Sequence, residues 1–178
     1  MKRLLSLAAI LLTLTMVLSL AACGEEPTPE ETDNQTPDSQ TEVAEPPATG
    51  VDLAALRTQL LTDCGLTDYV EVEADRLTEL YGIDAAQVVS ASGFTAMTGA
   101  AFPDEIMMVQ ATDEAAAADV AAKLEARLDA IAEQAASYDP DSQALAEKCE
   151  VVTDGVYVGL FFSSHYDEMV SAFQGAIG

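Results

Sequence analysis

The apolar residues between positions 51 and 178 recur every three or four positions in several stretches, as they do along the buried face of a helix. The strongest example runs from Glu114 to Ser137, where charged residues fill the positions between the apolar ones. Pro140 ends this pattern, because proline cannot continue the hydrogen bonds of a helix. The spacing predicts helices over residues 52–63, 73–81, 114–137 and 164–177, with a further helical turn over 142–147.

Other stretches have the composition of β-strands. Strands are predicted over residues 87–95, 105–111, 149–153 and 156–163. A loop over residues 96–103 joins the first two strands. The last two form the clearest hairpin, because Asp154 and Gly155 between them are a pair favoured in two-residue turns.

This order of elements predicts an α+β fold. Four antiparallel strands are expected to form one sheet. One long helix and several shorter helices pack on one face of that sheet, and this packing buries the apolar faces of the helices and strands. The predicted fold occupies residues 51–178, a length that suits a single domain with one core.

The N-terminus has the layout of an export signal. Lys2 and Arg3 precede an uncharged, largely apolar run over residues 4–20. A transmembrane helix needs about 20 residues, and this run is shorter than that. We therefore predict that residues 1–22 are a signal peptide, with an uncleaved anchor helix as the alternative.

A cysteine follows the run in the sequence Leu20-Ala21-Ala22-Cys23. This sequence resembles the lipobox of bacterial lipoproteins, which implies cleavage between Ala22 and Cys23 and a lipid on the Cys23 thiol. An ordinary secretory signal with an unmodified cysteine is the alternative. The resemblance implies a lipid-anchored protein on the extracytoplasmic face of the cell membrane, where two acyl chains give lasting attachment.

The segment that follows Cys23 has the composition of a disordered tether. Residues 24–50 contain five of the seven prolines, eight acidic residues and no basic or aromatic residue. So little apolar surface cannot offset the entropy lost on ordering. We therefore predict three parts: the signal peptide (1–22), the lipidated cysteine with its tether (23–50) and one folded domain (51–178).

The charge of the chain excludes one class of partner. Loss of residues 1–22 leaves five basic residues against 31 acidic ones, a formal net charge of −26. Nucleic acid and anionic lipid headgroups repel such a chain, so membrane contact depends on the lipid anchor. An envelope protein or a wall component remains a candidate partner, although solubility is the simplest consequence of the charge.

Two cysteines lie within the predicted domain. Cys64 and Cys149 belong to a compartment in which disulfides persist, and a bridge between them would close a long loop. The alternative is a pair of free, buried thiols. The sequence leaves both open.

The sequence has no catalytic or metal-binding pattern. His165 is the single histidine, and its neighbours Ser163 and Ser164 lie too close along the chain to form a nucleophile–base relay with it. One histidine and two distant cysteines also argue against a zinc site. The scattered glycines form no phosphate-binding loop, so no cofactor is expected.

Three carboxylates were weighed for acid–base chemistry or for a weak calcium or magnesium site. Asp139 and Asp141 flank a proline but lack the glycine and glutamate of a calcium loop. Glu105 follows Asp104 directly, so in a strand the two point to opposite faces and cannot act together. We assign no catalytic residue and no metal ligand from the sequence.

The loop over residues 96–103 is a candidate contact surface. It carries Met97 and Phe102 and no charged residue. Exposed apolar side chains there would mark the contact site of a partner. The alternative is that both side chains fold back onto the core.

The chain from about Leu80 to the C-terminal helix resembles a group of uncharacterised lipoproteins from anaerobic Gram-positive bacteria, known only as a domain of unknown function. The resemblance rests on four short motifs: Tyr81-Gly82-Ile83, Asp104-Glu105-Ile106, Tyr138-Asp139-Pro140 and Asp154-Gly155-Val156-Tyr157-Val158. Gly155-Val156 departs from the Gly-Asn that often precedes the tyrosine in that group, which affects only the turn. The resemblance implies an exported, lipid-anchored domain and transfers no activity.

The sequence predicts a lipid anchor, a tether and a single small domain without catalytic residues. This combination favours a non-enzymatic binding or interaction module. The alternatives are a small extracytoplasmic enzyme that acts through carboxylates and a surface protein that binds divalent cations weakly.

Overall fold

The computed structural model describes residues 50–178. The predicted signal peptide, Cys23 and the tether up to residue 49 lie outside the described residues, so these assignments stay predictions. Among the described helices, none is both long enough and apolar enough to cross a bilayer.

The described part of the chain contains both helices and strands. The helices are α1 (Leu53–Asp63), α2 (Leu77–Tyr81), α3 (Glu114–Ala135), α4 (Pro140–Lys148) and α5 (Tyr166–Ile177). The strands are β1 (Tyr69–Glu73), β2 (Val88–Ala96), β3 (Glu105–Ala111), β4 (Val152–Asp154) and β5 (Tyr157–Phe162). All the predicted helices are present, and a short 3₁₀ turn, η1 (Ala74–Arg76), supplies the start of the helix predicted over 73–81.

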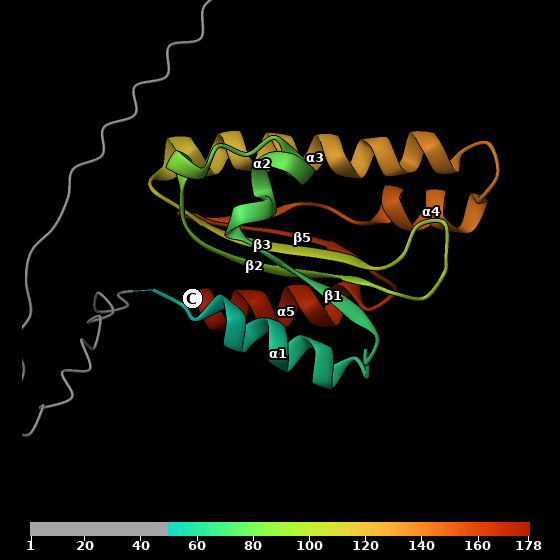
Figure 1. Cartoon of the computed structure of the whole chain (residues 1–178), viewed down its shortest axis with the longest axis horizontal. Helices are drawn as coiled ribbons and strands as arrows, with labels where there is room; N and C mark the ends of the chain where they lie inside the picture. The colour runs from blue at the N-terminus through green and yellow to red at the C-terminus, as the bar shows by residue number, and fades with distance from the viewer. Residues whose placement is uncertain (1–49) are drawn as a thin grey trace, which may run out of the picture. The chain divides into compact units, whose positions relative to one another are not determined.

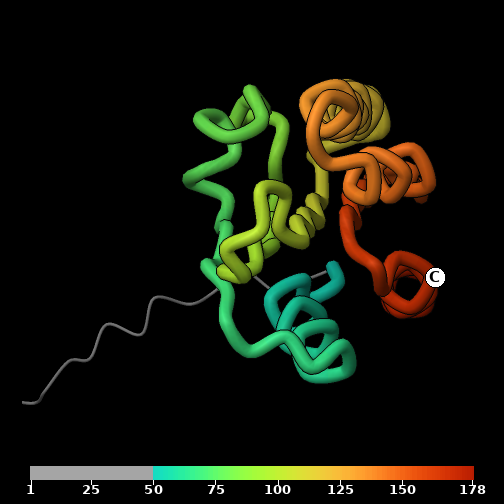
Figure 2. The backbone as a smooth tube through the Cα atoms, turned by 90° about the vertical axis from the view of Figure 1, so that its right-hand side faces the viewer, coloured from blue at the N-terminus to red at the C-terminus, as the bar shows by residue number. Residues whose placement is uncertain are grey.

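The strands form one antiparallel sheet in the order β1-β2-β3-β5-β4. Helices α2, α3 and α4 lie on one side of this sheet, and α1 and α5 lie on the other (Figure 1). Figure 2 shows the same layers with α3 seen end-on and α4 beside it. We call the side covered by α3 the α3 face and the side covered by α1 and α5 the α1 face.

The prediction that the helices pack on one face was wrong, because the central strand is apolar on both sides. On β3, Met107 and Val109 lie in the core of the α3 face, and Ile106 and Met108 lie in the core of the α1 face. All four side chains are fully buried. A strand with two apolar sides needs cover on both.

The predicted count of four strands was also wrong, because β1 adds a fifth strand at the edge. Its sequence, YVEVE, places acidic residues at alternate positions. Arg57 of α1 is buried and forms ion pairs with both Glu71, at 3.1 Å, and Glu73. It also donates a hydrogen bond of 2.9 Å to Ser92 Oγ on β2. Charge therefore contributes to holding this strand against α1.

Acidic residues begin three of the helices. Asp52, Asp113 and Asp139 each accept a hydrogen bond from the backbone N–H three residues further on, at 2.9, 2.8 and 3.1 Å. These bonds satisfy donors that the first helical turn leaves free. Three of the acidic residues thus stabilise helix starts.

Two local predictions were wrong by one residue. The hairpin loop begins at Gly155 rather than at Asp154, because Asp154 already pairs with Tyr157 in the sheet. Gly155 has a φ of 55°, a conformation that glycine adopts without strain. Helix α5 has His165 rather than Ser164 at its N-cap, and no side chain caps it.

Candidate functional site

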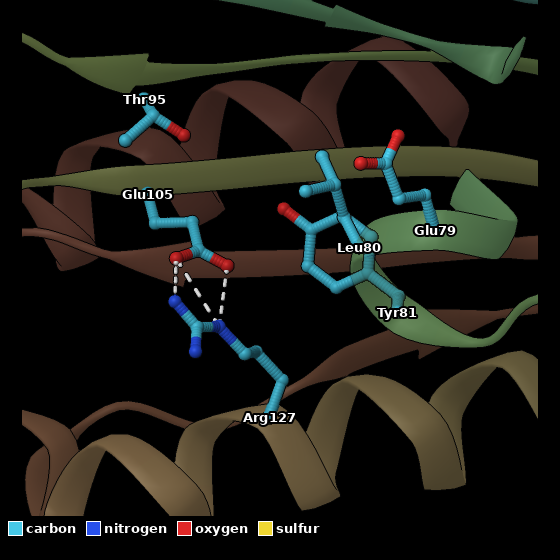
Figure 3. Close-up of a pocket in the computed structure, with 6 residues that line it drawn as sticks. All are labelled: Glu79, Leu80, Tyr81, Thr95, Glu105 and Arg127. Carbon is cyan, nitrogen blue, oxygen red and sulfur yellow. Dashed lines mark hydrogen bonds and ion pairs between the residues drawn. The ribbon is translucent and has the colours of Figure 1, made fainter. Parts of the chain in front are cut away.

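A cavity of about 270 Å³ opens on the α3 face, between α2, α3 and the sheet (Figure 3). Four elements supply its lining: Glu79, Leu80 and Tyr81 from α2, Thr95 from β2, Glu105 from β3 and Arg127 from α3. Polar and apolar side chains therefore meet in one hollow.

The register of the sheet brings part of this lining together. Val70 of β1 lies opposite Thr95 of β2, and Thr95 lies opposite Glu105 of β3. Residues directly opposite in a sheet project from the same face, so these three side chains form a row across the α3 face. Arg127 approaches the end of that row from α3, as Figure 3 shows.

The floor of the cavity is a bidentate ion pair between Glu105 and Arg127. Arg127 Nε donates to Glu105 Oε1 at 2.9 Å, and Arg127 Nη2 donates to Glu105 Oε2 at 2.6 Å. The Glu105 side chain is only 8% exposed, whereas that of Arg127 is 38% exposed. The hydrogen bond to Glu105 raises the pKa of the Arg127 guanidinium. The guanidinium therefore stays charged, and both oxygens of Glu105 accept hydrogen bonds from it.

Tyr81 lies beside this ion pair, with its hydroxyl directed toward Glu105 (Figure 3). Burial, and then the negative charge of Glu105, raise the pKa of the Tyr81 phenol far above its usual value. The phenol is therefore neutral and is held beside the carboxylate. Helix α2 ends at Tyr81 because Gly82 follows in the left-handed conformation, with a φ of 68°.

Apolar side chains remain exposed around the polar floor. Leu80 lines the cavity and is 44% exposed, and Val70, in the same row as Thr95 and Glu105, is 50% exposed. Leu80 is the aliphatic residue among the six that line the cavity, and the other five are polar or charged. The cavity therefore combines a polar floor with one apolar wall.

A family model matches residues 63–163, and its description is a domain of unknown function, DUF4358. The chain belongs to this family. The match confirms the predicted resemblance to an uncharacterised domain, although it begins earlier than the resemblance did and ends before α5. All six residues that line the cavity lie inside the DUF4358 match. No curated protein and no solved structure matches the chain.

The carboxylates weighed from the sequence do not gather in the DUF4358 domain. Asp139 caps α4, and Asp141 lies in the first turn of the same helix, so both stabilise its start. Glu105 faces the cavity but is neutralised by Arg127. Asp104 lies elsewhere: its carboxylate is hydrogen-bonded to Ser163, the residue that follows β5.

The two apolar residues of the β2–β3 loop have different environments. Met97 is 55% exposed, as a contact site requires. Phe102 is half-buried, packs against the core of the α3 face and stacks on Tyr138, with ring centroids 5.7 Å apart. Met97 and Tyr138 are therefore two large side chains that present exposed apolar surface.

Both cysteines of the described domain are free thiols. Cys149 is buried in the core of the α3 face, whereas Cys64 is half-buried and packs against the core of the α1 face. The candidate disulfide is therefore not formed in this structure. Cys64 instead lies near the start of α5, which carries His165.

Sequence reasoning assigned no function to Tyr81 or Arg127. Arg127 is one of the charged residues that lie between the apolar positions of the buried stripe of α3. It follows Leu124 by three positions and precedes Ile131 by four, so it borders that stripe. This spacing directs a long side chain toward the sheet and is the signal that could have identified it.

Proposed function

We propose that this protein is a lipid-anchored extracytoplasmic binding module and that the cavity lined by Tyr81, Glu105 and Arg127 is its recognition site. The lipobox-like sequence around Cys23 and the tether composition of residues 24–50 support the anchoring part of the proposal. The ion pair on the cavity floor supports the recognition part.

That ion pair is the observation on which the proposal depends. Removing two charges from water is costly, and apolar residues of similar size often stabilise a fold at least as well. A charged pair at the base of an open cavity, beside a fixed phenol, therefore suits recognition better than stability. A second terminal nitrogen of Arg127, Nη1, is bonded to no side chain in the described residues and is available to an oxygen of a ligand.

The same geometry favours binding over catalysis. A general acid or base needs a pKa near the working pH. Both oxygens of Glu105 already accept hydrogen bonds from Arg127, so neither is free to accept a proton from a substrate. The pKa of the Tyr81 phenol is raised far above neutral pH. The carboxylate-dependent enzyme therefore has weaker support.

The ligand class follows from the lining. Hydroxyl, carboxylate and guanidinium groups surround the floor, and the side chain of Leu80 forms an apolar wall. A wall-derived saccharide presents hydroxyl groups to such a floor and a C–H face to such a wall. A cavity of about 270 Å³ has room for one end of such a molecule.

The test is calorimetric titration of the full-length chain, in mild detergent, with muramidase-solubilised wall saccharides. We expect binding that Arg127→Met and Tyr81→Phe each weaken at least tenfold. Lys123→Met is the matched control, because Lys123 is a cation on the same helix that pairs with Asp119 outside the cavity. No heat from the wild-type chain, or equal binding by all variants, would contradict the proposal.

A contact surface for an envelope protein is the second candidate. Exposed Met97 and Tyr138 support it, because large apolar side chains on a surface mark contact sites. Cross-linking from Met97→Cys on whole cells would test it, with no adduct as the contradicting result.

A further inference from the structure

The fold brings together three potential metal ligands that are far apart in the sequence. Cys64 follows the end of α1, and His165 and Glu168 lie at the start of α5. One ligand atom from each residue lies within 4.8 Å of the other two. Among the described residues, this is the one group of three cysteine, histidine or acidic side chains that is compact enough to hold an ion.

The arrangement of the two helices explains this proximity. Helices α1 and α5 lie side by side on the α1 face and run in opposite directions, so the end of α1 lies beside the start of α5 (Figure 1). The site is thus on the opposite side of the sheet from the cavity between α2 and α3. The sequence argument against zinc counted one histidine and two distant cysteines, and it did not foresee this meeting of helix ends.

We propose that Cys64, His165 and Glu168 form a binding site for a thiophilic divalent cation, with Zn²⁺ as the best match. Zinc accepts sulfur, nitrogen and oxygen ligands, and three protein ligands leave a fourth position for water. Zinc–ligand bonds of about 2.0–2.3 Å place neighbouring ligand atoms roughly 3.5 Å apart in a tetrahedral site. Ligand atoms within 4.8 Å therefore need only small side-chain movements.

His165 and Glu168 are already aligned with each other. The His165 Nδ1 atom lies 2.9 Å from Glu168 Oε2, across the first turn of α5. This contact holds the ring in place beside Cys64. A cation that binds between these two atoms would take the place of this direct contact and would be ligated by both side chains.

The surrounding charge favours a cation. The carboxylates of Glu168, Asp63 and Asp104 all act electrostatically on Cys64. A reactive cysteine has the opposite environment, because positive neighbours stabilise its thiolate. A divalent cation would both satisfy these carboxylates and stabilise the thiolate, so a metal site fits these neighbours better than a nucleophile does.

Exposure is consistent with a site that a cation can enter. Cys64 and His165 are half-buried, and Glu168 is exposed. Asp104 acts electrostatically on both Cys64 and His165 and adds negative charge beside the site. The three ligands come from two helices that are packed against the core, so their backbone positions are fixed in advance.

The test is a Co²⁺ titration of the reduced full-length chain, purified in detergent without a histidine tag. Cobalt substitutes for zinc and reports a thiolate ligand through a charge-transfer absorption band. We expect one equivalent of Co²⁺ to produce this band and Zn²⁺ to remove it. Cys64→Ser should abolish the band, and His165→Gln and Glu168→Gln should each weaken metal binding at least about tenfold.

Cys149→Ser is the matched control, because Cys149 is the other free thiol of the described domain and lies in the other core. It should keep the band, and so it separates a site at Cys64 from general thiol binding. All variants keep the acidic N-terminal segment, so weak Co²⁺ binding to that segment contributes equally to every titration. As a second readout, Zn²⁺ should raise the unfolding temperature of the wild-type chain and not that of His165→Gln. No band in the wild-type chain, or a band that survives Cys64→Ser, would overturn the proposal.

Discussion

A Cβ atom on Gly93 of β2 would lie 2.1 Å from the carbonyl oxygen of Ile106 on β3. The obstacle is backbone in the centre of the sheet, so it cannot rotate away as a side chain could. Gly93 therefore sets how closely the two strands approach, and this pairing underlies the row that places Thr95 opposite Glu105.

Gly93→Ala should destabilise the domain by about 1–3 kcal/mol, because an added methyl group forces β2 and β3 apart. Urea unfolding followed by circular dichroism measures the change. Gly175→Ala is the control: no atom lies within 4 Å of a Cβ at that position of α5. Alanine favours helix there by up to about 1 kcal/mol, so this variant should be as stable as the wild-type chain or more so. Equal stability of the two variants would contradict the prediction.

Arg127→Met should lower the free energy of unfolding by about 3–5 kcal/mol, because it leaves the buried Glu105 carboxylate without its partner. The double variant Glu105→Gln/Arg127→Met should recover much of this loss, since no unpaired charge remains. Urea unfolding of both variants measures the non-additivity. Losses that simply add would show that the two side chains act independently.

The pKa of Tyr81 predicts how stability depends on alkaline pH. Burial raises the pKa of the folded-state phenol above its unfolded value of about 10. Above about pH 10 the unfolded chain releases a proton that the folded chain retains, so stability should fall as pH rises through this range. Below about pH 10 the group has no such effect. Tyr81→Phe should flatten the dependence of the unfolding free energy on pH above about pH 10. An unchanged slope would show that the Tyr81 phenol does not cause this dependence.

Arg57→Ala should release the edge strand β1. The substitution removes the ion pairs with Glu71 and Glu73 and the hydrogen bond to Ser92, at a cost of about 1–3 kcal/mol. Hydrogen exchange of the β1 amides should accelerate more than that of β3. Arg76→Ala, which removes an exposed ion pair with Glu79, is the control and should leave exchange in β1 unchanged.

The helices could be predicted from the sequence because their signals are local. Asp52 before α1, Gly82 after α2 and Pro140 after α3 each mark a helix end through the chemistry of one residue. The buried stripe of α3 follows equally from spacing, since Leu124 and Ile131 lie on one side of any helix. These features needed no knowledge of the rest of the fold.

The fifth strand and the second helical layer depended on contacts between distant residues. Glutamate is uncommon in strands, and Glu71 and Glu73 are accommodated in β1 because Arg57, on another element, forms ion pairs with both. The run Ile106-Met107-Met108 did contain the evidence for two covered faces, because it is apolar at successive positions. That evidence was missed because one core was assumed.

Neither the cavity nor the metal site could be found by spacing along the chain. Glu105 and Arg127 are 22 positions apart, and Cys64 and His165 meet only because α1 and α5 are antiparallel. The sequence pattern identified every helix and four of the five strands, and it left their arrangement open. Sites made from several elements depend on that arrangement.

The two edge strands of the sheet, β1 and β4, affect whether neighbouring molecules pair with one another at a membrane surface. β4 has only three residues and ends in Asp154, and β1 carries Glu71 and Glu73 along its length. Short or charged borders discourage one molecule from extending the sheet of the next. Molecules concentrated in two dimensions by a lipid anchor would meet border to border often. Edge strands that are short or occupied by ion-paired side chains would let these molecules crowd together and remain separate.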